Sequence, residues 1–343
     1  MEVKINSKIF ILSPWYKTGG VECLHQLADL LKKKGFHSGI VYPSIHKKIL
    51  YPQYSYDVFP KIEDNRKNIL IIPESMPKEI YKYKKIRKAI WWLSFDKAPL
   101  EEYLFLFNRF FYFLNRALRR IFGNPHKKIT KYLFDKKKTL LKEFYNIDHF
   151  CQSNYVKEKL KNKGIKNLEM LEDYIYLEKK TRKTKKQKKE NSVCYNPKKG
   201  FSYTKKIMKL NPAIQFIPLI NMTKEELYNQ LKKSKIYTDF GYHPGKDKIP
   251  REAALNDCII ITNTKGSAGN LRDVPSKYKI KEGDSLEKAS KIIKDCIKEY
   301  PERIKEFANY KRFVLRGKKN MENQISKIFK FKNKKKRFLI RTS

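Results

Sequence analysis

Residues 239–270 read DFGYHPGKDKIPREAALNDCIIITNTKGSAGN, and this stretch decides the fold and the site that the sequence predicts. It predicts a loop rich in glycine and proline, then a helix, a buried strand at 258–262 and a second loop of small residues. Small residues let the backbone approach a ligand closely, and free N–H groups at the start of a helix favour phosphate. A carboxylate on that helix can accept hydrogen bonds from ribose hydroxyls, so the stretch predicts a nucleotide-diphosphate site at the carboxyl ends of parallel strands. The residues of this predicted site are Gly241, His243, Lys248, Arg251, Glu252, Gly266 and Ser267.

Three other segments, in order along the chain, fit the same prediction. They are FILSPWYKTGGVECLHQLADLLKKKG (10–35), which contains the loop Thr18, Gly19 and Gly20, IWWLSFDKAP (90–99) and YNPKKG (195–200). With these segments the chain resembles the GT-B-fold glycosyltransferases, in particular the family-4-like enzymes that build bacterial surface polysaccharides. Members of that group transfer a sugar from a nucleotide-sugar donor to an acceptor.

The resemblance implies an α/β fold of two Rossmann-like domains with a nucleotide-sugar cleft between them. It implies that Glu252 is a ligand of the donor ribose or phosphate, and that Lys199 and the loop 18–20 contact the diphosphate. Many retaining members carry a second glutamate eight positions after the first, where this chain has Ile260. The resemblance therefore does not extend to a retaining mechanism, and the stereochemistry of transfer stays open.

Each of these residues also has a purely structural interpretation. Glu252 could complement the dipole at the start of its helix. Lys248 and Arg251 could pair with acids such as Asp247 instead of binding phosphate. The glycines of the loop 18–20 could form a tight turn, and the order and spacing of the four segments favour the functional interpretation over this one.

Two residues are predicted to take part in the transfer itself. Asp96 follows a strand that is expected to face the cleft, and it could deprotonate the acceptor hydroxyl as an inverting transfer requires. The alternative is that Asp96 caps the following helix. His243 is predicted to contact the donor sugar or its phosphates. Because no Asp-x-Asp sequence occurs, cationic side chains and helix dipoles are expected to stabilise the departing diphosphate, without a metal ion or any other cofactor.

The length and the charge of the chain limit the possible functions. Its 343 residues are enough for two domains that each have a core. With 78 Lys and Arg against 35 Asp and Glu, the net charge of +43 predicts anionic partners such as lipid, phosphorylated sugar or nucleic acid. Part of the lysine excess fits the codon bias of an AT-rich genome. The five cysteines are far apart and form no C-x-x-C, which favours reduced cysteines in a cytoplasmic protein over disulfides or a zinc site.

Short apolar runs alternate with helical patterns along most of the chain, which favours βαβ units and a parallel sheet. Strands are expected at 8–12, 38–42, 68–72, 88–93, 148–151, 192–195, 214–219, 235–239 and 258–262. Helices are expected at 19–34, 153–163, 202–210, 223–233 and 248–256, and further helical patterns occupy 284–299 and 301–320.

The predicted domain boundary lies in a charged and polar stretch, LEKKTRKTKKQKKEN, at 177–191, which reads as a linker. An acceptor-side domain is predicted for residues 1–176 and a donor-binding domain for residues 192–325, followed by a basic tail at 326–343. By resemblance, the last helix is expected to pack back on the first domain.

Residues 100–122 predict contact with a membrane surface. On a helical wheel their arginines and asparagines share one side, opposite a wide face of Leu, Phe, Tyr and Ile, which suits a helix in the lipid interface. The alternative is a helix that packs between the sheet and a neighbour. The basic tail would add attraction to anionic lipid. There is no apolar run of about 20 residues that could span a bilayer and no signal peptide pattern.

The function predicted from the sequence is therefore a glycosyltransferase that moves a sugar from a nucleoside-diphosphate sugar to a glycan or lipid-linked acceptor. It is expected in the cytoplasm, peripherally bound to the inner face of the plasma membrane. The alternatives are a GT-B-fold nucleotide-sugar epimerase and a basic nucleic-acid-binding protein. Nucleic acid is the less favoured partner, because the basic residues are spread along the chain and form no recognisable nucleic-acid module.

Overall fold

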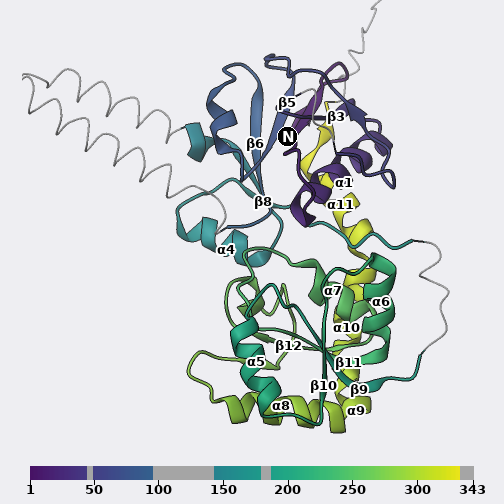
Figure 1. Cartoon of the computed structure of the whole chain (residues 1–343). Helices are drawn as coiled ribbons and strands as arrows, with labels where there is room; N and C mark the ends of the chain where they lie inside the picture. The colour runs from purple at the N-terminus through teal and green to yellow at the C-terminus, as the bar shows by residue number, and fades with distance from the viewer. Residues whose placement is uncertain (45–48, 96–142, 179–186, 333–343) are drawn as a thin grey trace, which may run out of the picture.

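The structure is a computed structural model that describes residues 1–44, 49–95, 143–178 and 187–332. It has two α/β lobes, the N-terminal one at the top of Figure 1 and the C-terminal one below it. Asp96, the predicted interfacial helix at 100–122 and the end of the basic tail lie outside the described residues, so their predicted roles stay predictions.

The first domain is built on a seven-stranded sheet in which every pair of neighbouring strands is parallel. In spatial order its strands are β4 (Asp57–Val58), β3 (Ser38–Val41), β2 (Ile9–Leu12), β5 (Ile69–Pro73), β6 (Arg87–Trp92), β7 (Asp148–Cys151) and β8 (Leu168–Met170). The central strands are continuous apolar runs, because helices and loops cover both faces of a parallel sheet.

Alternate residues of β2 belong to different cores on the two faces of this sheet. Ile9 and Ile11 pack in one core with helix α1 (Gly19–Lys33), while Phe10 and Leu12 pack in the other with helix α4 (Asn154–Asn162). A 3-10 turn, η1 (Pro77–Tyr81), follows β5. Because side chains alternate along a strand, α1 and α4 cover opposite faces of the sheet. Because the strands are parallel, their carboxyl ends lie at the same edge of the sheet.

The second domain has a parallel five-stranded sheet of its own. In spatial order its strands are β10 (Gln215–Pro218), β9 (Glu190–Tyr195), β11 (Ser234–Asp239), β12 (Ile259–Asn263) and β13 (Lys279–Ile280). Its other elements are α5 (Phe201–Lys209), α6 (Lys224–Lys233), α7 (Lys248–Leu255), the 3-10 turn η3 (Ser267–Gly269) and α8 (Leu286–Lys298). Helix α7 starts in the loop after β11, so its first turn lies at the carboxyl edge of the sheet, as the sequence predicts.

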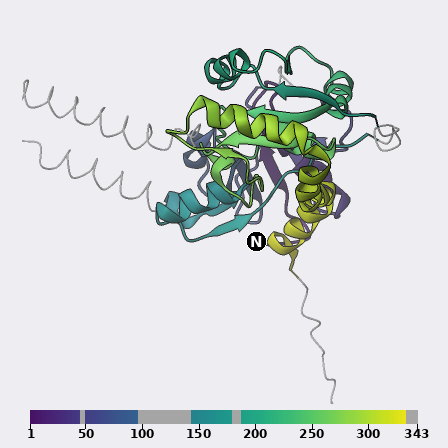
Figure 2. The same ribbon diagram turned by 90° about the horizontal axis from the view of Figure 1, so that it is seen from below.

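The end of the described chain returns from the second domain to the first. The helices α9 (Tyr300–Arg303), α10 (Ala308–Leu315) and α11 (Gly317–Ile328), with the 3-10 turn η4 (Ile304–Phe307), form the yellow column in Figure 1. Helix α11 buries Met321, Ile325 and Ile328 in the core of the first domain. Strand β14 (Lys330–Phe331) pairs with β1 (Glu2–Val3), which brings the N-terminus beside the end of this column in Figure 2.

This return confirms the expected packing of the last helix, but it changes the predicted domain limits. Residues 317–325 pack on the first domain, although the sequence assigns them to the second. Residues 326–331 were expected in a basic tail and instead complete α11 and form β14. Phe329 is only 2% exposed, because it packs in the core of the first domain. The lysine-rich composition of this segment does not reveal that apolar contact.

Candidate functional site

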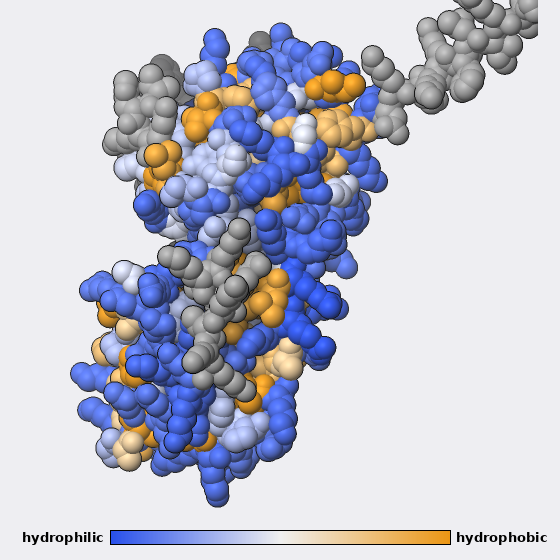
Figure 3. All heavy atoms as spheres, turned by 90° about the vertical axis from the view of Figure 1, so that its right-hand side faces the viewer, coloured by the Kyte–Doolittle hydropathy of each residue, from blue (hydrophilic) through white to orange (hydrophobic). Residues whose placement is uncertain are grey.

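The two lobes meet at a waist, which is visible from the side in Figure 3, where most of the visible surface is hydrophilic. Here the Phe95 N–H donates to the Pro244 carbonyl at 2.9 Å. A side chain at Gly245 would place its Cβ 2.1 Å from the Leu93 carbonyl oxygen, so only glycine allows this approach. In this loop, glycine brings the backbones of the two domains together instead of leaving room for a ligand.

A second contact between the domains lies at the start of α4. The Asp273 carboxylate, from the second domain, accepts hydrogen bonds from the backbone N–H groups of Asn154 and Tyr155, both at 2.8 Å. A helix start presents N–H groups without intrahelical partners, and its dipole favours a carboxylate. The two domains are therefore held together by specific polar contacts in the described state.

A cavity of about 440 Å³ lies between the domains, a size typical of small-molecule sites. The loop after β3 and the first turn of α1 form its wall in the first domain, and the starts of α6 and α7 form its wall in the second. It is lined by Glu22, Tyr51, Pro52, Gln53, Ile175, Tyr176, Glu178, Lys224, Lys248 and Glu252. Most of these residues are charged or aromatic, so the cavity can both hydrogen-bond and stack against a ligand.

Glu252 lies where the sequence predicts it, in the wall of this cavity and one turn into α7. It is only 8% exposed, and its Oε1 accepts a 3.4 Å hydrogen bond from the Tyr228 hydroxyl. Burial raises the pKa of Glu252, while Lys248 and Lys224 act in the opposite direction. Its carboxylate has spare capacity to accept hydrogen bonds from a ligand in the cavity.

The predicted diphosphate loop is the start of α1. Thr18 caps this helix, since its hydroxyl oxygen accepts a 3.2 Å hydrogen bond from Val21 N–H. A Cβ atom on Gly19 would lie 3.5 Å from Lys248 Cε. The Lys248 side chain therefore passes beside this loop, and a diphosphate bound at the loop would meet its ammonium. Gly20 lies beside Leu93, at the contact between the domains.

Glu22 is a cavity residue that the sequence analysis missed. Its carboxylate pairs with Lys248 across the two domains and accepts a 2.7 Å hydrogen bond from the Tyr54 hydroxyl. Burial alone would raise the pKa of Glu22, but Lys248 and Tyr54 outweigh this effect and lower it. The sequence signal that could have identified Glu22 is an acidic residue in the first turn of a helix that begins in a glycine loop.

In the described state Arg251 does not line the cavity. Its guanidinium donates to the Asp173 carboxylate at 2.8 Å, and both side chains are at most 3% exposed. Burial lowers the pKa of Arg251, and the charge of Asp173 more than reverses this effect. The pair joins α7 to the segment that follows β8 and leads from the first domain to the second. In the described state Arg251 therefore pairs with an acid, as the structural alternative states, but the acid is Asp173 and not the expected Asp247.

The other small-residue loop packs on the His243 loop. The Ser267 N–H donates to the His243 carbonyl at 2.8 Å, and Ser267 is fully buried. Gly266 has a φ of 67°, and a Cβ there would lie 2.0 Å from the same carbonyl oxygen. Gly241 donates its N–H to Asp239 at 3.0 Å. The described state therefore uses these three predicted donor-binding residues to shape a loop, and none of them lines the cavity.

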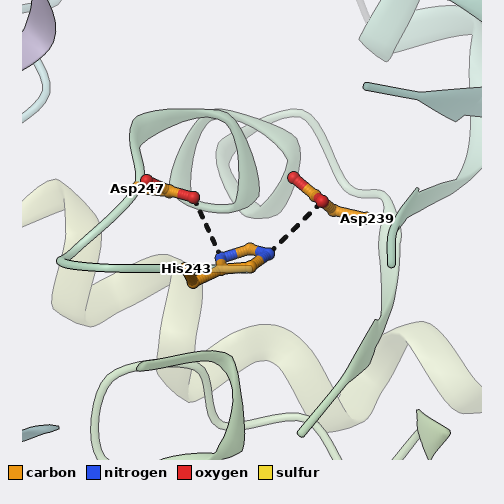
Figure 4. A group of neighbouring side chains, drawn as sticks. All are labelled: Asp239, His243 and Asp247. Atoms are coloured by element: carbon orange, nitrogen blue, oxygen red, sulfur yellow. Dashed lines mark ion pairs between the residues drawn. The ribbon is translucent and has the colours of Figure 1, made fainter. Parts of the chain in front are cut away.

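His243 lies between the carboxylates of Asp239 and Asp247 (Figure 4). Its Nε2 is 3.4 Å from an Asp239 oxygen, and its Nδ1 is 3.1 Å from an Asp247 oxygen. Asp247 also pairs with Lys199. His243 is fully buried, so in the described state it contacts these carboxylates and not the cavity. The sequence correctly places Lys199 and His243 at the edge of the sheet, but it does not reveal that Asp247 joins them.

The oxygens and nitrogens of Asp239, His243 and Asp247 are close enough to hold a metal ion. One ligand atom from each of the three residues lies within 4.8 Å of the others. Asp247 also pairs with the Lys199 ammonium, so an ion bound here would compete with Lys199 for that carboxylate.

A further buried acid, Glu74, holds the corner at which β6 meets the second domain. Its two carboxylate oxygens accept hydrogen bonds from Leu93 N–H at 3.1 Å and from the Ser94 hydroxyl at 3.0 Å. Glu74 is 7% exposed, and burial raises its pKa to about 7. The same corner carries Phe95, which reaches across to the second domain.

We predict that Glu74→Gln changes how stability depends on pH. In the folded protein Glu74 keeps its proton up to about pH 7, whereas the ordinary value of 4.5 applies after unfolding. The folded state therefore binds more protons in this window, and stability falls as pH rises through it, by about 3 kcal/mol for this group. Urea unfolding at pH 5 and pH 8 should show a smaller pH effect in the variant. Equal pH effects in both proteins would contradict the burial of an ionisable Glu74.

Comparison with solved structures identifies the architecture. Sucrose-phosphate synthase from Thermosynechococcus elongatus matches with a TM-score of 0.59 and 9% identity over 94% of this chain and 98% of the other. HepE from Anabaena, in complex with UDP, matches with a TM-score of 0.54 and 12% identity over 94% and 99%. A TarM variant from S. aureus, also in complex with UDP, matches at 0.51 and 12% over 78% and 56%.

The chain has the GT-B fold. Two parallel α/β domains face each other across a cavity, and the last helix returns to the first domain. This confirms the fold class and the architecture that the sequence resemblance implies. No protein-family model matches the sequence. No curated protein matches it either. At 9–12% identity the solved structures establish the fold and leave the activity to be argued from the site.

Proposed function

We propose that this GT-B-fold protein is a glycosyltransferase that uses a nucleoside-diphosphate sugar as its donor. The observation that carries the proposal is the cavity between the domains, with the Glu252 carboxylate in its wall and the Lys248 ammonium beside the start of α1. A carboxylate suits the ribose diol, and a helix start with a nearby cation suits a diphosphate. Both kinds of group are within one cavity, as a nucleoside diphosphate requires.

The placement of the donor follows from these contacts. The nucleoside would occupy the part of the cavity near Tyr176 and Lys224, with its ribose hydroxyls on Glu252. The diphosphate would lie between the loop 18–20 and Lys248, and Lys248 would then exchange Glu22 for phosphate oxygens. HepE has been crystallised with UDP-glucose, and its shared fold supports a donor of this class.

The chemistry breaks the bond between the anomeric carbon and the diphosphate oxygen and forms a bond from that carbon to the acceptor oxygen. The acceptor proton passes to a base, for which we propose Asp96, and the nucleoside diphosphate leaves with an added negative charge. A cation fixed beside this charge acts mostly in the transition state. Lys248 beside the diphosphate loop, and Lys199 at the neighbouring sheet edge, can supply this stabilisation.

A panel of UDP-, GDP-, ADP- and dTDP-sugars tests the proposal directly. The protein should bind one class of donor in the micromolar to millimolar range of ordinary enzymes and hydrolyse it slowly without acceptor. Release of free sugar would support transfer chemistry, whereas a change of sugar configuration without release would support the epimerase alternative. Binding to none of these donors, together with salt-sensitive binding to RNA or DNA, would replace the proposal by the nucleic-acid alternative.

We predict that transfer or hydrolysis does not need a divalent metal ion. No Asp-x-Asp sequence is present, and lysine side chains are available to meet the diphosphate. Activity should therefore stay within about twofold after treatment with a chelator, because the cations that stabilise the leaving group belong to the protein. Activity that disappears with chelator and returns with Mg²⁺ or Mn²⁺ would contradict this prediction.

We also propose that the acceptor is a glycan or a lipid-linked glycan and that the protein works in the cytoplasm, at the inner face of the plasma membrane. The proposal rests on the amphipathic pattern at 100–122 and on the lysine-rich end of the chain. Among the residues that the structure describes, no helix is long and apolar enough to cross a bilayer.

Binding to vesicles tests the proposed location. Affinity for vesicles of anionic lipid should fall with salt without vanishing, because salt screens the charge but not the burial of apolar side chains. Replacing Phe107, Phe111 and Leu114 together with serine should remove the salt-resistant part while donor hydrolysis survives. If the parent ignores such vesicles and the triple variant unfolds, this segment belongs to the protein core.

A further inference from the structure

The His243 ring lies between two carboxylates, and each ring nitrogen faces a different one, as Figure 4 shows. A carboxylate only accepts hydrogen bonds, whereas a neutral imidazole has one N–H and one bare nitrogen. A neutral ring would therefore direct a lone pair at one of the carboxylates in a fully buried place. Neither ring nitrogen makes a hydrogen bond of good geometry in this structure, but each lies within ion-pair distance of a carboxylate. A hydrogen on both nitrogens would place a positive ring between the two carboxylates, so the geometry favours a positively charged ring.

Asp239 forms the buried end of this arrangement. Its carboxylate accepts 3.0 Å hydrogen bonds from Gly241 N–H and from the Tyr237 hydroxyl. Burial raises the pKa of Asp239, but contact with His243 and the Gly241 N–H outweighs this and keeps the pKa below its ordinary value. An ionised Asp239 at 3.4 Å from Nε2 favours a hydrogen on that nitrogen.

Asp247 forms the open end. It occupies the N-cap position of α7 but makes no capping hydrogen bond with its side chain. The carboxylate instead lies between the His243 ring and the Lys199 ammonium. The side chains of Lys199 and Asp247 are 29% and 25% exposed, so water and ligands can reach this end. Asp247 thus divides its charge between a buried cation and an accessible one.

We propose that His243 is a positioning residue which, protonated on both ring nitrogens, neutralises Asp247 and so makes Lys199 available to a donor diphosphate. The inference rests on the proposed function, and it changes the predicted role of His243 from a donor contact to a group that acts through Asp247 and Lys199. Without the charged ring, Asp247 would hold Lys199 more tightly, and a diphosphate would have to compete with that carboxylate for the ammonium. With the ring in place, Lys199 can leave while Asp247 stays paired.

The first experiment reads the ring directly, without any donor. In a ¹⁵N spectrum of the histidine-labelled protein at pH 7, both His243 nitrogens should have the shifts of protonated nitrogens. His25 and His149 provide internal references, because burial lowers the pKa of each to about 4 and their rings are neutral at this pH. The His243→Gln variant assigns the signals. A His243 ring with one protonated nitrogen would overturn the proposal.

The second experiment measures coupling between His243 and Lys199. For the nucleoside diphosphate that the parent binds from UDP, GDP, ADP and dTDP, His243→Gln should raise Kd roughly tenfold, the effect of one charge-assisted contact. The same replacement in a Lys199→Ala background should change Kd little, because the group through which His243 acts is gone. Adding Asp247→Asn to His243→Gln should restore most of the affinity, since the competing carboxylate loses its charge.

The outcomes separate the two proposals. Independent effects of His243→Gln and Lys199→Ala, or no recovery with Asp247→Asn, would overturn the positioning role while leaving the donor cavity intact. A parent protein that binds none of the four nucleoside diphosphates would contradict the proposed function, whatever the ring spectrum shows. If His243→Gln fails to fold, the Asp247→Asn single variant takes its place: it should shift the ¹⁵N signals of the neighbouring ring and so assign them, and it should bind the diphosphate at least as tightly as the parent.

Discussion

Asp173→Ala is expected to be among the most destabilising single substitutions in this protein. The Asp173 carboxylate and the Arg251 guanidinium form an ion pair in which the two side chains are 0% and 3% exposed. Removing the acid leaves the guanidinium buried without its counter-charge, which typically costs about 3–5 kcal/mol. The loss should appear as a large fall in the urea midpoint and in Tm. The effect should be a stability effect first, because Arg251 holds α7 and does not line the cavity.

Two controls make this prediction specific. Glu302→Ala removes an acid from an ion pair whose side chains are 69% and 75% exposed, so it should change stability by no more than about 0.5 kcal/mol. Replacing both partners, as Asp173→Leu with Arg251→Met, should recover much of the loss, since no uncompensated charge remains. If Asp173→Ala lowers the free energy of unfolding no more than Glu302→Ala does, the Asp173–Arg251 pair is open to water and the prediction is wrong.

Most of the fold could be predicted from the sequence, because its signals are local. Each of the nine expected strands and the first five expected helices occurs within two residues of its predicted limits. Continuous apolar runs and helical periods are properties of short segments. The strands that the sequence analysis missed are β1, β4, β8, β13 and β14, which have two or three residues each and are too short for a periodic pattern. In addition, β1 and β14 pair with each other from opposite ends of the described chain, as Glu2 and Lys330 show.

The site could be predicted only in part, because charge pairs depend on distant residues. Glu252 and Lys248 follow from the loop and helix pattern, and both line the cavity. Arg251 lies between them in sequence, but it pairs with Asp173 instead of lining the cavity. Residues within one turn of the same helix therefore take part in different contacts, and the sequence pattern alone does not tell them apart. Glu22 was missed because its role depends on Lys248 of the other domain. The glycine loops were read as ligand sites, yet the approach of Gly245 to Leu93 could not be foreseen without the domain arrangement.

The cavity also explains why two carboxylates from different domains can have different tasks. Glu22 pairs with Lys248, and its pKa is lowered in spite of its burial. Burial raises the pKa of Glu252, whose carboxylate accepts, among the described residues, a 3.4 Å hydrogen bond from Tyr228. Glu22 is therefore occupied in holding a cation, whereas Glu252 keeps free acceptor positions. If a donor diphosphate takes Lys248 from Glu22, donor binding and the contact between the domains are coupled through that one lysine.

Glu252→Gln is accordingly expected to give the largest loss of donor affinity for a single isosteric change. The substitution keeps the shape of the side chain and its contact with Tyr228, but it removes the charge that strengthens hydrogen bonds to ribose hydroxyls. Hydrogen bonds to charged groups contribute about 1.5–3 kcal/mol, so Kd should rise roughly ten- to a hundredfold. Stability should not fall, because a buried acid with a raised pKa is replaced by a neutral group.

The matched control for this prediction is Glu178→Gln, the same chemical change at another residue that lines the cavity. Glu178 is exposed, so water screens its charge and the variant should bind the donor within about twofold of the parent. Calorimetric titration of parent and both variants with the nucleoside diphosphate decides the matter, and thermal unfolding checks that each is folded. A folded Glu252→Gln protein that binds as tightly as Glu178→Gln would remove Glu252 from the donor site and, with it, the observation on which the proposed function mainly rests.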